Sequence, residues 1–298
     1  MEPPGTTGAG DHVSRRRSRS SHFFLAGTVI AVAAVVAVAV AADEKQEPSL
    51  TPAPTATPVA AEGSSASRRR RPRLETIRTG GGVRDAEIVR PQGGEELPGV
   101  IFLHGWGLVE RSDYRPWIRH LARAGNQVIV PRYQRDENSD PGRSLDDAVA
   151  GIRRALRRVP AARRQLVVGG HSAGGALAAD YAGVARARGL PRPDAVVSVY
   201  PGRRILGYPQ GIPEVDPGRI PSGTRILAMA GDRDTVVGRA PAQELVTDAR
   251  QVGAARKRYV LVRRRSVAGH YGPTRATRLA RRVFWGRVDR LIAAARGQ

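Results

Sequence analysis

A five-residue turn in the middle of the chain places a serine where it could act as a nucleophile. Gly170, Ser172 and Gly174 fit the pattern G-x-S-x-G, between a strand-like run at residues 165–169 and a helix-like run at 173–188. At such an elbow the chain folds back so tightly that side chains two residues from the serine would clash, and glycine avoids the clash. An ordinary glycine-rich loop in an α/β protein is the alternative, because it can carry the same pattern. The strand-like run before the serine and the helix-like run after it are the context that the catalytic motif requires, and they support the catalytic interpretation.

The base that a catalytic serine needs is predicted at His270. A serine hydroxyl becomes a useful nucleophile when a histidine takes its proton and a carboxylate orients that histidine. In open α/β sheets, functional residues gather beyond the carboxyl ends of the strands, and His270 follows the strand-like run 258–262. It is also the only histidine after Ser172 in the sequence. A histidine in an ordinary surface loop is the alternative.

Two aspartates compete for the orienting role. Asp232 and Asp234 both follow the strand-like run 225–230, in the segment Gly-Asp-Arg-Asp-Thr-Val-Val. Asp234 precedes Thr-Val-Val, a pattern typical of a loop that enters a helix, and is the preferred candidate. Asp232 is interpreted as a residue that caps the turn. The predicted catalytic set is therefore Ser172, Asp234 and His270, in that order along the chain.

Backbone N–H groups that could stabilise a developing oxyanion are predicted on two loops. One donor is the N–H of Ala173, directly after the serine. The other is the N–H of Trp106 in the loop His104-Gly105-Trp106-Gly107, where Gly105 and Gly107 would let the backbone approach a substrate. The Trp106 ring either lines the acyl pocket or packs against the core. His104 is interpreted as a histidine that binds loop backbone rather than as a base.

From residue 74 onward, strand-like and helix-like runs alternate. This order predicts an α/β fold with a mostly parallel sheet and helices on both faces. A Pro- and Gly-rich segment, residues 201–223, would form either a small cap near the predicted site or a plain connecting loop. The predicted strands are residues 83–89, 99–103, 127–130, 165–169, 195–200, 225–230 and 258–262. The predicted helices are residues 113–124, capped by Ser112 or Asp113, and residues 145–159, 173–188, 240–252 and 275–295.

The first 73 residues have a different character. Residues 1–22 are polar and basic, residues 23–42 are uncharged and mostly apolar, and residues 43–73 have the composition of a disordered linker. A run of about 20 such residues can span a bilayer, and the charges around it predict a cytoplasmic N-terminus with residues 74–298 outside. An uncleaved membrane anchor is preferred because the run exceeds the usual length of a signal core. Secretion after cleavage is the alternative.

Composition limits the chemistry and the partners. The 298 residues include no cysteine, which excludes disulfides, thiolate metal sites and a cysteine nucleophile. No metal site is predicted. The net charge is +22, from 49 Lys and Arg against 27 Asp and Glu. The arginines come in short runs without interleaved aromatic residues, which favours solvated charge on helix faces and does not predict a nucleic-acid partner.

Four motifs together resemble the α/β-hydrolase superfamily over residues 80–298. They are, in order, His-Gly-Trp-Gly after a strand, Gly-His-Ser-Ala-Gly-Gly, Gly-Asp-Arg-Asp-Thr-Val-Val and Gly-His-Tyr-Gly. The stretch 104–133 is similar to exported bacterial esterase-like or dienelactone-hydrolase-like members. The resemblance implies Ser172 as nucleophile, His270 as general base and acid, and Asp234 as its orienting residue. It also implies an acyl-enzyme resolved by water, with no metal or organic cofactor.

These inferences predict a serine hydrolase that cleaves carboxylic esters of small or lipid-like molecules. It would be tethered to the membrane through residues 23–42 or exported. A peptidase or amidase on the same fold is one alternative, because ester and amide specificity depend on pocket shape. A catalytically inactive binding module at the cell surface is another, although the complete set Ser172, Asp234 and His270 argues against it. The sequence does not predict the oligomeric state.

Overall fold

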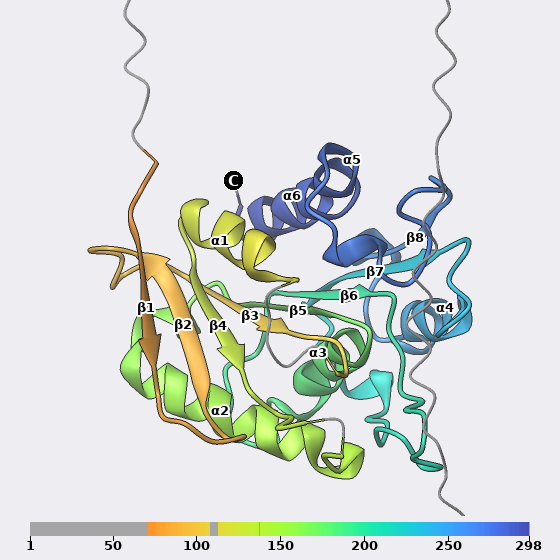
Figure 1. Ribbon diagram of the computed structural model, residues 1–298, viewed down its shortest axis with the longest axis horizontal. Helices are drawn as coiled ribbons and strands as arrows, with labels where there is room; N and C mark the ends of the chain where they lie inside the picture. Colours follow the sequence, from red (N-terminus) through yellow and green to blue (C-terminus); the bar gives the residue numbers. More distant parts are fainter. Residues whose placement is uncertain (1–70, 108–112, 137, 298) are drawn as a thin grey trace, which may run out of the picture. The chain divides into compact units, whose positions relative to one another are not determined.

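The computed structural model describes residues 71–107, 113–136 and 138–297 (Figure 1). The predicted N-terminal segment 1–22, the predicted membrane segment 23–42 and the predicted linker up to residue 70 lie outside the described residues. Within the described ranges, no helix combines the length and the apolar composition that a membrane span requires.

Eight strands form one sheet in the order β1-β2-β4-β3-β5-β6-β7-β8 (Figure 1). The strand β2 pairs antiparallel with β1 and β4, and every other neighbouring pair is parallel. The predicted mostly parallel sheet is therefore confirmed. The strands are β1 Leu74–Arg78, β2 Ala86–Pro91, β3 Gly99–Leu103, β4 Gln127–Pro131, β5 Val167–His171, β6 Ala195–Val199, β7 Arg225–Gly231 and β8 Lys257–Val262.

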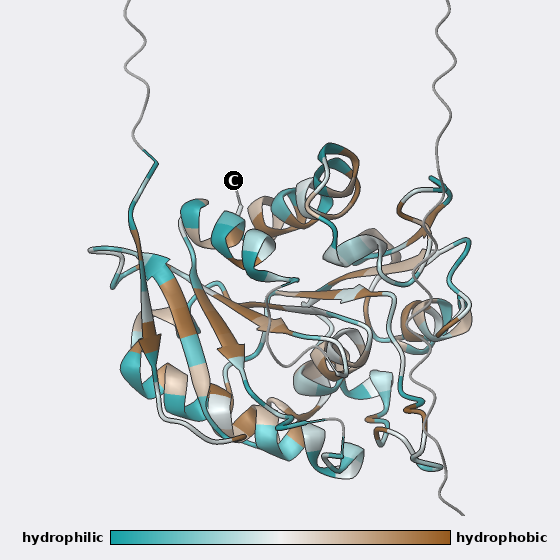
Figure 2. Cartoon of the chain, in the orientation of Figure 1, coloured by the Kyte–Doolittle hydropathy of each residue, from teal (hydrophilic) through white to brown (hydrophobic). Residues whose placement is uncertain are grey.

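The strands near the middle of the sheet are buried on both faces. Every residue of β3, β4, β5 and β6 is buried, as expected for parallel strands covered by helices on each side. Successive side chains of a strand enter opposite layers. In β3, Ile101 packs in one hydrophobic cluster, whereas Val100 and Phe102 pack in the other. Figure 2 shows the hydrophobic colour along β4 and neighbouring strands.

Helices cover both faces of the sheet (Figure 1). Residues of α2, α3 and α4 belong to one core cluster, and residues of α1 and α6 belong to the other. The helix α3 is buried at every position, whereas α2 buries only one stripe and leaves its arginines outside. The helices are α1 Arg115–Arg123, α2 Ser144–Arg158, α3 Ala173–Val184, α4 Ala240–Asp248, α5 Arg278–Ala280 and α6 Gly286–Ala295.

Several local predictions are corrected. The helix α1 begins at Arg115 with Tyr114 at its N-cap and no side-chain cap, so the prediction that Asp113 caps it is wrong. The alternative cap, Ser112, lies outside the described residues. The first strand, β1, was not predicted because only two of its five residues are apolar and it lies at the edge of the sheet. The last predicted helix is divided, since a π-helical turn, Arg281–Trp285, lies between α5 and α6.

Segment 201–223 connects β6 to β7 with little regular structure. It contains one short 3₁₀ turn, Pro217–Arg219, and a tight turn closed by a bridge between Ile205 and Tyr208. Ile212 is buried in the core, whereas Leu206, at the tip of the tight turn, is 99% exposed. The segment therefore consists mostly of irregular backbone, which is typical of a connecting loop.

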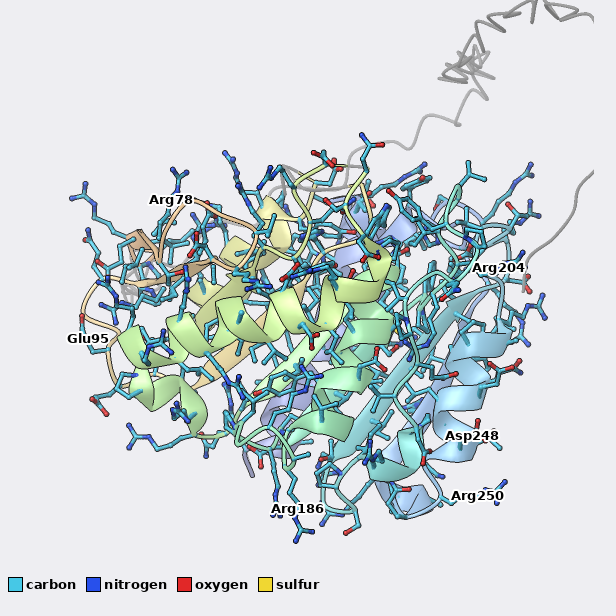
Figure 3. The ribbon with its side chains drawn as sticks, turned by 90° about the horizontal axis from the view of Figure 1, so that it is seen from below. Arg78, Glu95, Arg186, Arg204, Asp248 and Arg250 are labelled. Atoms are coloured by element: carbon cyan, nitrogen blue, oxygen red, sulfur yellow. The ribbon has the colours of Figure 1, made fainter. Side chains whose placement is uncertain are left out.

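Charged side chains project from many different elements. Figure 3 shows Arg78, Arg186, Arg204 and Arg250, which come from β1, from the end of α3, from segment 201–223 and from the end of α4. All four are exposed. The basic character is thus distributed over the outer surface, as the sequence pattern indicated.

Candidate active site

The serine elbow forms where β5 meets α3. Ser172 adopts a φ of +56°, a left-handed conformation that non-glycine residues rarely adopt. Glycine is required on both sides by close backbone contacts. A Cβ on Gly170 would lie 2.4 Å from the carbonyl oxygen of Gly174, and a Cβ on Gly174 would lie 2.2 Å from that of Leu103. The glycines therefore permit both the fold-back of the chain and the close approach of β3.

Ser172, His270 and Asp234 form one continuous hydrogen-bonded set. His270 Nε2 lies 3.0 Å from Ser172 Oγ, and His270 Nδ1 lies 2.9 Å from Asp234 Oδ2. Asp234 and His270 are 7% and 8% exposed, and Ser172 is partly exposed. Each residue stands just beyond the carboxyl end of a parallel strand, namely β5, β7 and β8. The shared edge of the sheet therefore brings together residues that are far apart in the sequence.

The carboxylate of Asp234 is held in its ionised form. Its Oδ1 accepts hydrogen bonds from the backbone N–H groups of Val236, at 2.9 Å, and Val237, at 3.1 Å. Burial raises the pKa of Asp234, but its bond with His270 and the two backbone donors outweigh burial and lower the pKa below its usual value. Asp232 instead pairs with Arg239, so it does not contact the histidine.

The loop after β3 lies against the elbow and contains the other predicted residues. The N–H of Gly105 donates to the Tyr114 hydroxyl at 3.1 Å, and the N–H of Gly107 donates to Gln134 Oε1 at 2.9 Å. In the described part of the chain, the N–H groups of Trp106 and Ala173 make no hydrogen bond to a protein acceptor. These two groups are the predicted oxyanion donors.

His104 and Trp106 are both anchored in the protein. His104 is 1% exposed, its Nδ1 lies 2.8 Å from the carbonyl oxygen of Gly105, and its ring stacks on Tyr133 at 4.2 Å. The Trp106 ring packs partly buried against the core, and its centroid lies 6.2 Å from that of Tyr208. His104 thus lies within the loop as the sequence analysis expected, and Trp106 connects this loop to segment 201–223.

Several buried polar residues around the site were not predicted from the sequence. Tyr114, His171 and Tyr200 are each 0% exposed and hydrogen-bonded to the loops that hold the predicted residues. A signal was present for His171, which is a polar residue at the end of an otherwise apolar strand, directly before Ser172. For Tyr114 and Tyr200 the sequence gives no comparable signal, because an aromatic residue is equally expected in the core.

A family model for the alpha/beta hydrolase fold matches residues 100–221. This match begins in β3, contains the serine elbow and ends before β7, and the remaining strands extend the same parallel sheet. The chain therefore has an α/β-hydrolase fold, and its sequence resembles the α/β-hydrolase superfamily. The resemblance that the four sequence motifs carried is therefore confirmed at the level of the superfamily.

Solved structures of esterases and of a putative dienelactone hydrolase have a similar fold. A putative dienelactone hydrolase from Klebsiella pneumoniae subsp. pneumoniae MGH 78578 is 20% identical, covering 74% of this chain and 99% of its own, with a TM-score of 0.52. An esterase from Pyrobaculum calidifontis is 20% identical, with coverage of 75% and 85% and a TM-score of 0.56. Inhibited esterase B from Lactobacillus rhamnosis is 18% identical, with coverage of 77% and 89% and a TM-score of 0.58. No match among curated proteins was found.

Proposed function

We propose that this protein is a serine hydrolase that cleaves carboxylic esters through an acyl-enzyme. The observation that carries the proposal is the unbroken set of hydrogen bonds from Ser172 Oγ to His270 Nε2 and from His270 Nδ1 to Asp234 Oδ2, at 3.0 and 2.9 Å. This is the arrangement that nucleophilic catalysis by serine needs. The strained elbow supports it, because backbone strain of this kind is found at functional sites.

In the proposed reaction, His270 Nε2 accepts the proton of Ser172 Oγ as the oxygen attacks the ester carbonyl carbon. The carbonyl oxygen becomes an oxyanion, which the N–H groups of Trp106 and Ala173 would stabilise. When the intermediate collapses, the alcohol leaves and takes the proton from His270. A water molecule then attacks the acyl-enzyme with His270 again as base, and release of the carboxylic acid restores Ser172. The carboxylate of Asp234 stabilises the imidazolium that forms in both steps.

We further propose that residues 23–42 hold this hydrolase at the membrane with its catalytic domain outside the cytoplasm. The length of that apolar segment and the charges around it support the proposal. Cleavage after the segment would instead release the hydrolase into the medium. Detection of the full-length chain in the membrane fraction, accessible to an externally added protease, would support the anchor.

The full-length chain in a mild detergent can be tested with p-nitrophenyl esters of increasing acyl length and with p-nitroanilides of the same acids. We expect hydrolysis of the esters and labelling of Ser172 by a fluorophosphonate. Both should be lost in Ser172→Ala and retained in Ser266→Ala, which changes an exposed serine on the loop between β8 and His270. Cleavage of the anilides without cleavage of the esters would favour the alternative function, a peptidase or amidase. A folded wild-type chain that is neither active nor labelled would refute the proposal and favour a binding module.

A further inference from the structure

A second histidine, His171, lies beside the proposed catalytic set but is not part of it. It is the last residue of β5, directly before Ser172, and is 0% exposed. Its ring centroid lies 4.9 Å from that of His270. Both of its ring nitrogens have partners: Nε2 lies 2.9 Å from the backbone carbonyl oxygen of His270, and Nδ1 lies 2.6 Å from the hydroxyl of Tyr114.

These partners determine which group donates and which accepts in each hydrogen bond of His171 and Tyr114. A carbonyl oxygen only accepts, so Nε2 of His171 carries the proton and donates to the carbonyl of His270. In a neutral imidazole Nδ1 must then accept, so the Tyr114 hydroxyl donates to it. The Tyr114 oxygen in turn accepts the N–H of Gly105 at 3.1 Å. Burial, reinforced by the charge of His270, lowers the pKa of His171 to about 3, which keeps the ring neutral.

The resulting chain of hydrogen bonds connects the two loops whose positions matter most for the proposed reaction. It starts at Gly105, the neighbour of the predicted oxyanion donor Trp106, and ends at the backbone of His270. It passes through the elbow residue that precedes Ser172. A shift of either loop by a fraction of an ångström would misalign the donor or the base relative to the serine, and such misalignment is costly in rate.

We propose that Tyr114 and His171 are positioning residues that fix the oxyanion loop and the His270 backbone relative to Ser172. The proposal rests on the proposed serine-hydrolase function. Other contacts also support these loops: the Tyr200 hydroxyl donates to the carbonyl of Val267 at 3.0 Å, and Gln134 accepts from Gly107. Loss of one link in the chain should therefore change the alignment of the site without unfolding the domain.

Tyr114→Phe in the full-length chain is the primary test, because it removes only the hydroxyl and keeps the ring packed against Phe102. We expect kcat for p-nitrophenyl butyrate to fall about ten- to a hundredfold, with KM changed by less than about threefold. The rate of fluorophosphonate labelling should fall in parallel.

The matched control is Tyr181→Phe. Tyr181 is also buried and donates one hydrogen bond, to the carbonyl of Pro191 at 3.1 Å, but it lies about two and a half helical turns beyond Ser172 in α3. We expect both variants to lower the midpoint of thermal unfolding by similar amounts. Only Tyr114→Phe should lower kcat. Equal kcat values for the two variants would overturn the positioning role.

Substitutions at His171 separate positioning from simple packing. The amide N–H of His171→Gln can still reach the carbonyl of His270, whereas His171→Ala removes the donor. We expect His171→Gln to retain at least about tenfold more of kcat than His171→Ala. Wild-type activity in His171→Ala, or no difference between the two folded variants, would overturn the proposal. An inactive, unlabelled wild-type chain would overturn the proposed function as well, so the two failures are distinguishable.

Discussion

At the scale of single residues, the elbow depends on glycines that leave no room for a side chain. In Gly174→Ala the new Cβ would meet the carbonyl oxygens of Leu103 and His104 at 2.2 and 2.4 Å, and neither backbone can move without displacing β3 or its loop. We expect a loss of unfolding free energy of about 2–4 kcal/mol and the loss of most esterase activity. Gly253→Ala, where nothing lies within 4 Å of the new Cβ, should remain within about 0.5 kcal/mol of wild type. Denaturant titration of both variants measures the difference, and equal stability would contradict the steric argument.

The protonation of His171 gives a second prediction at this scale. Its pKa is lowered to about 3, through burial and the charge of His270, whereas a histidine in the unfolded chain titrates near about 6.5. Between these pH values the unfolded chain binds more protons. The stability contributed by neutral His171 is therefore complete above about pH 6.5 and is lost progressively as the pH falls towards 3.

The variant His171→Gln lacks this titration. Its unfolding free energy should fall less steeply than that of wild type between about pH 6.5 and 4, by up to about 1.4 kcal/mol per pH unit. Tyr114, His270 and Asp234 lie near position 171 in both proteins, so the comparison isolates the contribution of the His171 side chain. Urea titrations at several pH values measure the two slopes. Equal slopes for wild type and His171→Gln would show that His171 binds protons equally in the folded and the unfolded chain.

At the scale of elements, one buried ion pair holds segment 201–223 against α3. The two terminal guanidinium nitrogens of Arg203 each lie 2.8 Å from a carboxylate oxygen of Asp180, which is 0% exposed. Burial raises the pKa of Asp180 despite this pairing. The N–H of Val215 also donates to Asp180. The pair thus fixes two positions of the connecting segment, which also contacts Trp106 of the oxyanion loop through Tyr208.

Removing the cation should therefore destabilise the protein strongly. In Arg203→Ala the buried carboxylate loses its charge partner, and we expect a loss of about 3–5 kcal/mol in unfolding free energy. The exposed neighbour gives the control, since Arg204→Ala should change stability by less than about 0.5 kcal/mol. Chemical denaturation compares the two variants. A small effect of Arg203→Ala would mean that water reaches Asp180 in solution.

The elements themselves could be predicted well from sequence, and their exact ends and partners could not. A buried parallel strand such as β3 has a continuous apolar sequence, which predicts a strand. The serine motif requires a strand before it and a helix after it, and the runs on its two sides agree with that requirement. The edge strand β1 and the π-helical turn at Arg281–Trp285 depend on tertiary packing that local patterns do not encode. The same is true of the contact between Tyr114 and His171, which are 57 residues apart in the sequence.

At the scale of the whole molecule, the net charge is +22, and in the described part of the chain arginines project from several different elements. The site itself contains a buried set, Asp234 and two histidines, inside the protein. Surface charges act on a substrate through solvent, where salt screens them within about 8 Å at physiological ionic strength. We expect kcat/KM for a neutral ester to change less than about twofold between about 50 and 500 mM salt. A steep decrease with salt would contradict this expectation.

Exposed hydrophobic side chains stand on the loops around the proposed catalytic residues. In the described part of the chain, the large hydrophobic residues that stand exposed are Leu206, Val236 and Tyr271. Val236 follows Asp234, Tyr271 follows His270, and Leu206 caps the turn that contacts the oxyanion loop. Each hydrophobic side chain that leaves water gains about 25 cal/mol per Å² of apolar surface. We therefore expect this edge of the sheet to adsorb to an oil droplet, so that an emulsion would orient Ser172 towards the dispersed ester.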